Sequence, residues 1–168
     1  MLSACPEPFA PFFGEVGGLL DLHYLELALH QRNVPLSPQH HVYAERDARG
    51  EILYVALRDA GKLIGYFIGF VNPGLHYSTC LTLLLDVFFI HPDHRKGSGG
   101  MRMFRTVEAE ARRRGVQRIF VGSKLHKDAS RLFEALGYEP VEVHFSKWIG
   151  DDPVPALPCL ETAGGVSL

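Results

Sequence analysis

One stretch of the sequence decides the fold: residues 85–104, which read LDVFFIHPDHRKGSGGMRMF. It begins as an apolar, strand-like run, passes through a polar loop, and enters an amphipathic helix after Gly97, Gly99 and Gly100. Glycines let the backbone approach a ligand closely and adopt positive φ angles. The first N–H groups of a helix have no partner within the helix and carry the positive end of its dipole. The stretch therefore predicts a phosphate or pyrophosphate site on the main chain of residues 97–101.

Three anion-binding motifs compete for this stretch. A Walker loop ends in G-K-[ST], which is absent here. A dinucleotide fingerprint requires G-x-G-x-x-G. Gly97 and Gly99 fit its first two glycines, but Arg102 occupies the third position, and no acidic residue stands at the expected ribose position around 117–120. The third motif, the pyrophosphate loop of coenzyme A enzymes, fits best.

Working outward, apolar spacing and turn residues predict the elements on both sides of the loop. Strands joined by tight turns pair antiparallel, whereas strand–helix–strand crossovers give parallel pairs. The expected fold class is therefore α/β (α+β), with a mixed, mostly antiparallel sheet flanked by about four helices. The predicted elements are helices over 19–29 and 38–48, strands over 52–57, 63–71 and 79–90 with turns at 59–61 and 72–74, a helix over 99–114, a strand over 116–122, a helix over 128–137 and a strand over 139–149.

Length and composition predict one domain. The chain has 168 residues, of which 46% are hydrophobic and 21% charged, as is ordinary for a globular protein. We expect an irregular N-terminal segment over 1–14, the domain over 15–149, and a Pro- and Gly-rich tail over 150–168. The net charge of -2 gives no general attraction to nucleic acid or to an anionic membrane, so neither partner is expected.

The cysteines favour a reducing compartment. Cys5, Cys80 and Cys159 are odd in number and far apart, which argues against a disulfide framework or a zinc site, and no metal is expected. Residues 1–8 lack the features of a secretory signal, and the apolar run at 81–90 is too short to span a bilayer. A cytoplasmic location is therefore expected.

The glycine stretch resembles the signature of the GCN5-related N-acetyltransferase (GNAT) superfamily, [Q/R]-x-x-G-x-[G/A]. Here the pattern runs from His94 to Gly99, with His94 in its first place. Other short motifs, in the same order, resemble the acetyltransferase-like proteins of tailed phages over residues 15–149. These motifs are Gly65-Tyr66, His76-Tyr77, Asp86-x-Phe88-Phe89, Arg95-Lys96-Gly97, Gly115-Val116, Lys124-Leu125-His126-x-Asp128, Leu136-Gly137-Tyr138 and Ser146-Lys147.

The resemblance implies an N-acetyltransferase that takes acetyl-coenzyme A as co-substrate and a primary amine of a protein or small molecule as acceptor, in the host-cell cytoplasm if a phage encodes it. In the superfamily the central strands splay apart, and the pantetheine arm lies in the gap along one strand, here Phe88, Phe89 and Ile90. The oligomeric state stays open, with a homodimer as one option. The residues expected to hold the pyrophosphate are Arg95, Lys96, Gly97, Ser98, Gly99, Gly100, Met101 and Arg102.

Amine transfer needs a base, because an ammonium has no lone pair with which to attack. Asp86 is the first candidate, since burial in an apolar strand raises the pKa of a carboxylate, and strand alternation places it on the face of Phe88 and Ile90. A purely structural Asp is the alternative. His76 is a second candidate base with Tyr77 as an acceptor-positioning residue, although both also suit a loop at the rim.

One position departs from the superfamily pattern. Many members carry a Tyr in the late helix that protonates the leaving thiolate, and here Phe133 occupies that place. Either the thiolate leaves unassisted, or His126, Ser123 or Tyr138 donates the proton, or the site is catalytically weak. The last option keeps a second function open, a GNAT-fold binding module that occludes a partner protein.

Two further groups of residues have both a structural and a functional interpretation. His23 and Glu26 lie one turn apart on a helix and either line the acceptor pocket or form a solvated face. The arginines at 112–114 end a helix, where cations offset the dipole. Nucleic-acid binding through them is the weakest hypothesis, because basic and aromatic residues do not alternate there.

Overall fold

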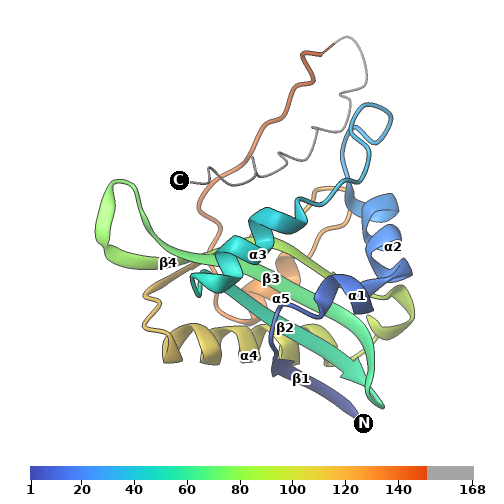
Figure 1. Ribbon diagram of the computed structural model, residues 1–168, viewed down its shortest axis with the longest axis horizontal. Coiled ribbons are helices and arrows are strands. Elements are labelled where there is room, and N and C mark those ends of the chain that lie inside the picture. The colour runs from blue at the N-terminus through green and yellow to red at the C-terminus, as the bar shows by residue number, and fades with distance from the viewer. Residues whose placement is uncertain (151–168) are drawn as a thin grey trace, which may run out of the picture.

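The computed structural model describes residues 1–150, which form a five-stranded sheet with helices on both faces (Figure 1). The strands lie in the sheet in chain order. The elements are β1 (Leu2–Pro6), α1 (Phe12–Val16), α2 (Gly18–Leu27), α3 (His40–Ala48), β2 (Ile52–Asp59), β3 (Lys62–Gly74), β4 (Tyr77–Ile90), the 3₁₀ turn η1 (Pro92–His94), α4 (Gly99–Arg113), β5 (Arg118–Phe120) and α5 (Ser130–Ala135).

The sheet is mixed, as predicted. β1 to β4 pair antiparallel, and β5 runs parallel to β4 because α4 crosses over between them. The helices predicted over 19–29 and 99–114 are confirmed within two residues at each end as α2 and α4. No helix within residues 1–150 is long and apolar enough to cross a membrane.

Two hydrophobic cores lie on opposite faces of the sheet. On β2, Leu53 and Val55 point into the core beneath α4 and α5, whereas Tyr54 and Ala56 point into the core beneath α1, α2 and α3. Both faces of β2 are therefore buried, which explains why its sequence is an unbroken apolar run rather than an alternating one.

The expectation that residues 1–14 are irregular is wrong. Residues 2–6 form β1, which pairs with β2 from Leu2 opposite Asp59 to Pro6 opposite Val55. Leu2 and Ala4 pack against the core while Ser3 and Cys5 are exposed, an alternation too short to stand out in sequence, and pairing with β2 orders the segment. The tail expected over 150–168 lies, apart from Gly150, outside the described residues.

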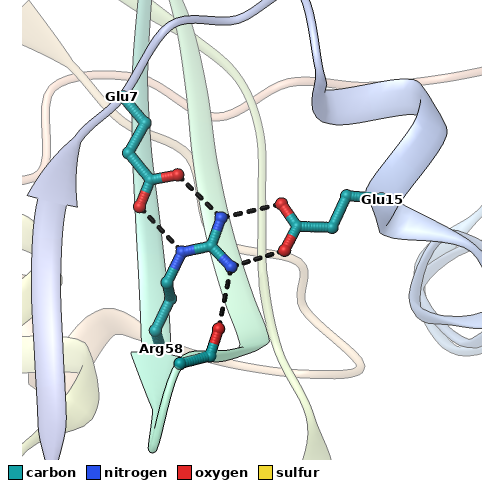
Figure 2. A network of polar contacts seen from close by, with 4 residues as sticks. Glu7, Glu15 and Arg58 are labelled. Carbon is teal, nitrogen blue, oxygen red and sulfur yellow. Dashed lines mark hydrogen bonds and ion pairs between the residues drawn. The ribbon is translucent and has the colours of Figure 1, made fainter.

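Arg58 fixes the N-terminal segment to the sheet (Figure 2). Its guanidinium donates to both carboxylate oxygens of Glu7 at 2.8 and 2.7 Å and to both of Glu15 at 2.5 and 2.7 Å. It also donates to the carbonyl of Gly61 at 3.0 Å. A single side chain of β2 thus holds the end of β1, helix α1 and the β2–β3 turn together.

The turn predicted at 72–74 is also wrong, because β3 continues through Pro73 to Gly74. The last pair between β2 and β3 is Ile52 with Phe70, so Pro73 lies beyond the end of β2. Its missing N–H therefore leaves no gap in a ladder on that side. The hairpin turns later, at Leu75 and His76.

The last predicted strand, over 139–149, is not a strand in the structure. Val141, Val143 and Phe145 alternate as in a strand, but their side chains are 70%, 68% and 95% exposed. The alternation indicates an extended segment with one apolar face. A ladder also needs a partner edge, and no described strand pairs with this segment.

Replacing Arg58 with lysine is expected to lower the free energy of unfolding by about 1–2 kcal/mol, because lysine cannot bind two carboxylates in bidentate fashion. Hydrogen bonds from Arg58 lower the pKa of Glu15. The contribution of the Arg58–Glu15 ion pair to the free energy of unfolding is therefore complete above the unfolded-state pKa of glutamate, about 4.3. It is lost as the pH falls below that value. Urea unfolding at pH 7 and pH 3 measures both effects.

The exposed pair between Arg49 and Glu51 provides the control. Arg49→Lys is expected to change stability by less than about 0.5 kcal/mol. An Arg58→Lys effect as large at pH 3 as at pH 7 contradicts the assignment.

Candidate functional site

The strand that leads into the glycine loop carries a β-bulge at Asp86. Ile68 of β3 pairs with Val87, but the next residue, Gly69, pairs with Leu85, so Asp86 is the extra residue of β4. A bulge bends its strand and puts two consecutive side chains on one face.

The bulge corrects the predicted orientation of Asp86. Strand alternation placed it on the face of Phe88, but Phe88 packs against Phe104 of α4 whereas the Asp86 carboxylate meets Tyr43 of α3. Val87 packs on the same side as Asp86. Asp86 therefore faces α1, α2 and α3, on the side of the sheet opposite α4.

The Asp86 carboxylate is held by one strong hydrogen bond. The Tyr43 hydroxyl donates to Oδ2 of Asp86 at 2.5 Å. Partial desolvation raises the pKa of Asp86, although its side chain is still exposed to solvent, and the Tyr43 hydrogen bond and the charge of Arg46 partly oppose that rise. A carboxylate with a raised pKa accepts a proton more readily than one in water. Tyr43 is a residue that sequence reasoning missed, because its position in α3 carries no motif.

β4 and β5 splay apart where the bulge begins. They pair only from Thr82 with Arg118 to Leu84 with Phe120. From residue 85 to Ile90, the edge of β4 toward β5 carries no strand in the described part of the chain. This open edge includes Phe88 to Ile90, the segment expected to bond a pantetheine arm. The Ile90 carbonyl already accepts a hydrogen bond from Nε of Arg95 at 2.7 Å.

The glycine loop presents four consecutive main-chain N–H groups. Those of residues 98–101 donate to no described residue, and the first intrahelical bond runs from Arg102 N to Ser98 O at 2.9 Å. Gly97 adopts a φ of 155° and has open space where a side chain would start. A Cβ on Gly100 would lie 3.0 Å from Leu132 Cδ2, so this glycine lets α4 approach α5. The free amides fit the anion site expected from the sequence, and binding of an anion there stays a prediction.

The loop's cations divide into two groups. Arg95 donates to both carboxylate oxygens of Glu26 at 2.5 and 2.7 Å, which neutralises its charge. Lys96 and Arg102 are exposed and form no ion pair with any residue the structure describes. The charge available to a phosphate therefore comes from Lys96 and Arg102, and Arg95 joins the loop to α2.

Glu26 connects three parts of the site. Besides Arg95, it pairs with Lys127 Nζ at 3.3 Å, and its main-chain carbonyl lies 3.3 Å from Nε2 of His126. The hydrogen bonds from Arg95 and Lys127 lower the pKa of Glu26. Helix α2, the glycine loop and the β5–α5 loop are thereby held around the open edge of β4.

His23 does not share partners with Glu26. Its Nδ1 is hydrogen-bonded to the Tyr66 hydroxyl at 2.6 Å, and its ring stacks on Phe89 at 5.0 Å. Burial lowers the pKa of His23 to about 4, with the charge of Lys124 adding to the effect and that of Glu26 opposing it. His23 is therefore a neutral imidazole beside β4, on the same face of the sheet as Asp86.

The structure does not bring His76 and Tyr77 to this site. They lie at the tip of the β3–β4 hairpin, about 30 Å along the strand from Asp86 at 3.3 Å per residue. The long hairpin that projects from the body in Figure 1 ends at these residues.

The candidate proton donors differ in their surroundings. Phe133 is buried among aromatic rings, 5.1 Å from Phe104 between centroids, and carries no proton to donate. The Ser123 hydroxyl donates to Asp128 at 2.8 Å as part of the turn that begins α5. The buried Tyr138 hydroxyl has no partner within residues 1–150. His126 is exposed, on the loop that faces the open edge.

The arginines at 112–114 form ion pairs with glutamates of their own helix, α4. Arg113 and Arg114 both bind Glu110 at 2.7 Å, and Arg112 lies 3.8 Å from Glu108. These ion pairs support the helix-end interpretation rather than an exposed nucleic-acid surface.

Comparisons with known proteins agree with this geometry. The model of the Acetyltransferase (GNAT) family matches residues 20–138. No curated protein matches the chain. The structure is similar to that of a ribosomal-protein-alanine N-acetyltransferase from Brucella melitensis biovar Abortus 2308, with a TM-score of 0.65 and 15% identity, covering 89% of this chain and 100% of that chain.

Two further structures share the fold. One is a predicted acetyltransferase with acetyl-CoA from Clostridium acetobutylicum, with a TM-score of 0.62, 13% identity, and coverage of 88% of this chain and 96% of that chain. The other is glucosamine-6-phosphate N-acetyltransferase from Arabidopsis thaliana, with a TM-score of 0.66, 8% identity, and coverage of 89% and 99%. At these identities the likeness establishes the fold.

The Tyr43 hydrogen bond is expected to set the pKa of Asp86. Tyr43→Phe removes a bond that favours the charged carboxylate, so the pKa of Asp86 should rise. Carbon NMR of the aspartate carboxyl groups measures it directly. Tyr24→Phe is the matched control, because its hydroxyl donates to the Val34 carbonyl at 2.8 Å instead. An unchanged or lower pKa in Tyr43→Phe would show that the bond does not form.

Proposed function

This chain belongs to the acetyltransferase (GNAT) family, and on that premise we propose that it transfers the acetyl group of acetyl-coenzyme A to a primary amine. The observation that carries the proposal is the set of four unpaired N–H groups at residues 98–101, placed where the β4–β5 gap opens. The family and the acetyltransferase neighbours support acyl transfer in general. The acceptor, a protein or a small molecule, is a matter for experiment.

The residues around the gap suit coenzyme A. The amides of residues 98–101, at the positive end of α4, would hold the pyrophosphate with Lys96 and Arg102. The open edge of β4 at Phe88 and Phe89 would accept the pantetheine arm as an added strand. When bound, acetyl-coenzyme A supplies an acetyl thioester. The charge of Arg95 is committed to Glu26, so we assign Arg95 a positioning role.

Asp86 is the proposed base. Its carboxylate takes a proton from the ammonium of the acceptor, which frees the nitrogen lone pair to attack the thioester carbonyl carbon. The C–N bond forms, the nitrogen releases its second proton to solvent, the C–S bond breaks, and the sulfur leaves as a thiolate that takes up a proton. Partial desolvation by the surrounding protein raises the pKa of Asp86 in the direction of a working base, while its exposed side chain stays accessible to an acceptor.

Protonation of the thiolate falls to His126 or to solvent. Phe133 lies in the core, and the Ser123 proton is committed to Asp128. His76 and Tyr77 take no part in the proposed reaction, because the hairpin carries them far from Asp86.

The alternative function is a binding module that retains the fold and occludes a partner protein. The burial of Phe133, where many superfamily members carry a tyrosine, favours it. Two sequence-based expectations accompany either function, a likeness to acetyltransferase-like proteins of tailed phages and a cytoplasmic location. The short motifs and the free thiols of Cys5 and Cys80 support them.

Arg102→Ala is expected to weaken acetyl-coenzyme A binding about tenfold, because a guanidinium next to the amide cradle makes charge-assisted bonds to phosphate. Titration calorimetry measures the Kd. Arg105→Ala, an exposed arginine of α4 one turn farther from the cradle, should leave the Kd within about twofold. Equal effects of the two variants, or no heat with the wild type, contradict the proposed pyrophosphate site.

Asp86→Asn is expected to lower kcat for thiol release about a hundredfold or more, because the amide cannot accept the ammonium proton. The assay follows free coenzyme A with a thiol reagent, using a panel of primary amines. Acetyl-coenzyme A binding should stay unchanged. If Asp86→Asn retains turnover and acetyl-coenzyme A binding, Asp86 is not the base. If wild-type protein turns over no amine, the result favours the binding module.

A further inference from the structure

An apolar pocket opens beside Asp86 on the side of the sheet opposite α4. It encloses about 290 Å³ between α1, α2, the segment 28–38 and the bulged part of the sheet. Its lining includes Phe13 of α1, Leu20 of α2, Leu29 and Val34 of the segment 28–38, and Val87 of β4. Its volume lies at the lower end of the range for small-molecule sites.

The pocket lining carries no charged side chain among the described residues. Its side-chain polar atoms are three hydroxyls, those of Tyr24, Ser37 and Tyr43. The Tyr24 hydroxyl is occupied by the Val34 carbonyl at 2.8 Å, and that of Tyr43 by Asp86. A ligand inside the pocket therefore meets hydrocarbon almost throughout. Strongly hydrated groups such as phosphates and sugar hydroxyls would lose their water there without replacement.

The rim of the pocket is apolar as well. Leu29, Val34 and Leu36 have exposed fractions of 48%, 41% and 39% although they line the pocket. Exposed apolar side chains grouped around a hollow mark a binding surface more often than a chance arrangement.

The carboxylate of Asp86 lies beside the pocket, and the positive charge of Arg46 also acts on it. Tyr43 lines the pocket and bonds to the Asp86 carboxylate, and Val87, next to Asp86 in the bulge, also lines it. A ligand with an apolar body and an ammonium end would place its body in the pocket and its nitrogen at Asp86. The open edge of β4 would present the thioester to the same nitrogen.

We propose that this pocket binds the aromatic or similarly apolar substituent of a small amine acceptor, so that the chain acetylates arylalkylamine-type substrates. The inference rests on the proposed function and narrows its acceptor. A dry cavity of about 150 Å³ holds one benzene ring, so the space found here suits a substituent of one or two rings.

The test compares two amines that share an aminoethyl group, 2-phenylethylamine and ethanolamine. Wild-type protein should show kcat/KM at least about tenfold higher for 2-phenylethylamine, because the ring gains burial that the hydroxyl lacks. Ala28→Phe fills the pocket from the end of α2 and should raise KM for 2-phenylethylamine about tenfold with little change in kcat. The same variant should leave ethanolamine kinetics within about twofold.

Ala109→Phe, on the exposed face of α4, is the matched control and should leave both substrates unchanged. Thermal unfolding checks that each variant folds, and the two-substrate comparison in wild type requires no variant.

Three outcomes separate this inference from the proposed function. Turnover of ethanolamine or of a peptide amine with none of 2-phenylethylamine overturns the inference and keeps the acetyltransferase. Binding of 2-phenylethylamine that Ala28→Phe abolishes, without turnover of any amine, supports the pocket and overturns the proposed reaction. Acetyl-coenzyme A binding without binding or turnover of 2-phenylethylamine overturns the pocket assignment.

Discussion

The arrangement of the site depends on one extra residue in β4. Because Asp86 is inserted opposite the Ile68–Gly69 step of β3, the side chains of Asp86 and Val87 turn to the same face of the sheet. Phe88, which follows, packs into the other core beneath α4. The insertion coincides with the point beyond which β5 no longer pairs with β4. A single irregularity thus brings a carboxylate, an apolar floor and an open strand edge together.

The two halves of the proposed site lie on different helices and are joined across the strand. The N-terminus of α4 offers unpaired amides and the cations Lys96 and Arg102, which suit an anion. Helices α1 and α2 border an apolar hollow, and β4 supplies the Asp86 carboxylate beside it; together they suit an amine with an apolar substituent. The ion pair between Glu26 and Arg95 joins these halves, because it connects the donor loop to α2. This ion pair gives Arg95 a structural task, and the phosphate contact expected for it stays a prediction.

Local chemistry made the donor half of the site predictable. Glycines before an amphipathic helix specify free amides and close approach, and these follow from neighbours in sequence. The acceptor half was harder to predict. The bulge, which depends on pairing with β3, turns the Asp86 side chain to the face opposite the one that strand alternation predicts. Tyr43 carries no motif, and its role arises from α3 packing over the sheet. His76 and Tyr77 preceded the strand in sequence, but the length of the hairpin separated them from its far end.

The sequence by itself determined the order of helices and strands from α2 to α5 and the mixed sheet, because periodic burial and helix-end chemistry are properties of short segments. Only the tertiary structure decided which strand edges are paired with another strand. It ordered residues 2–6 on the free edge of β2, and it left Val141 and Phe145 exposed although they alternate as a strand does. The physical reason is that a strand is completed by hydrogen bonds to another strand. The register of that pairing, bulge included, lies in contacts between residues distant in the chain.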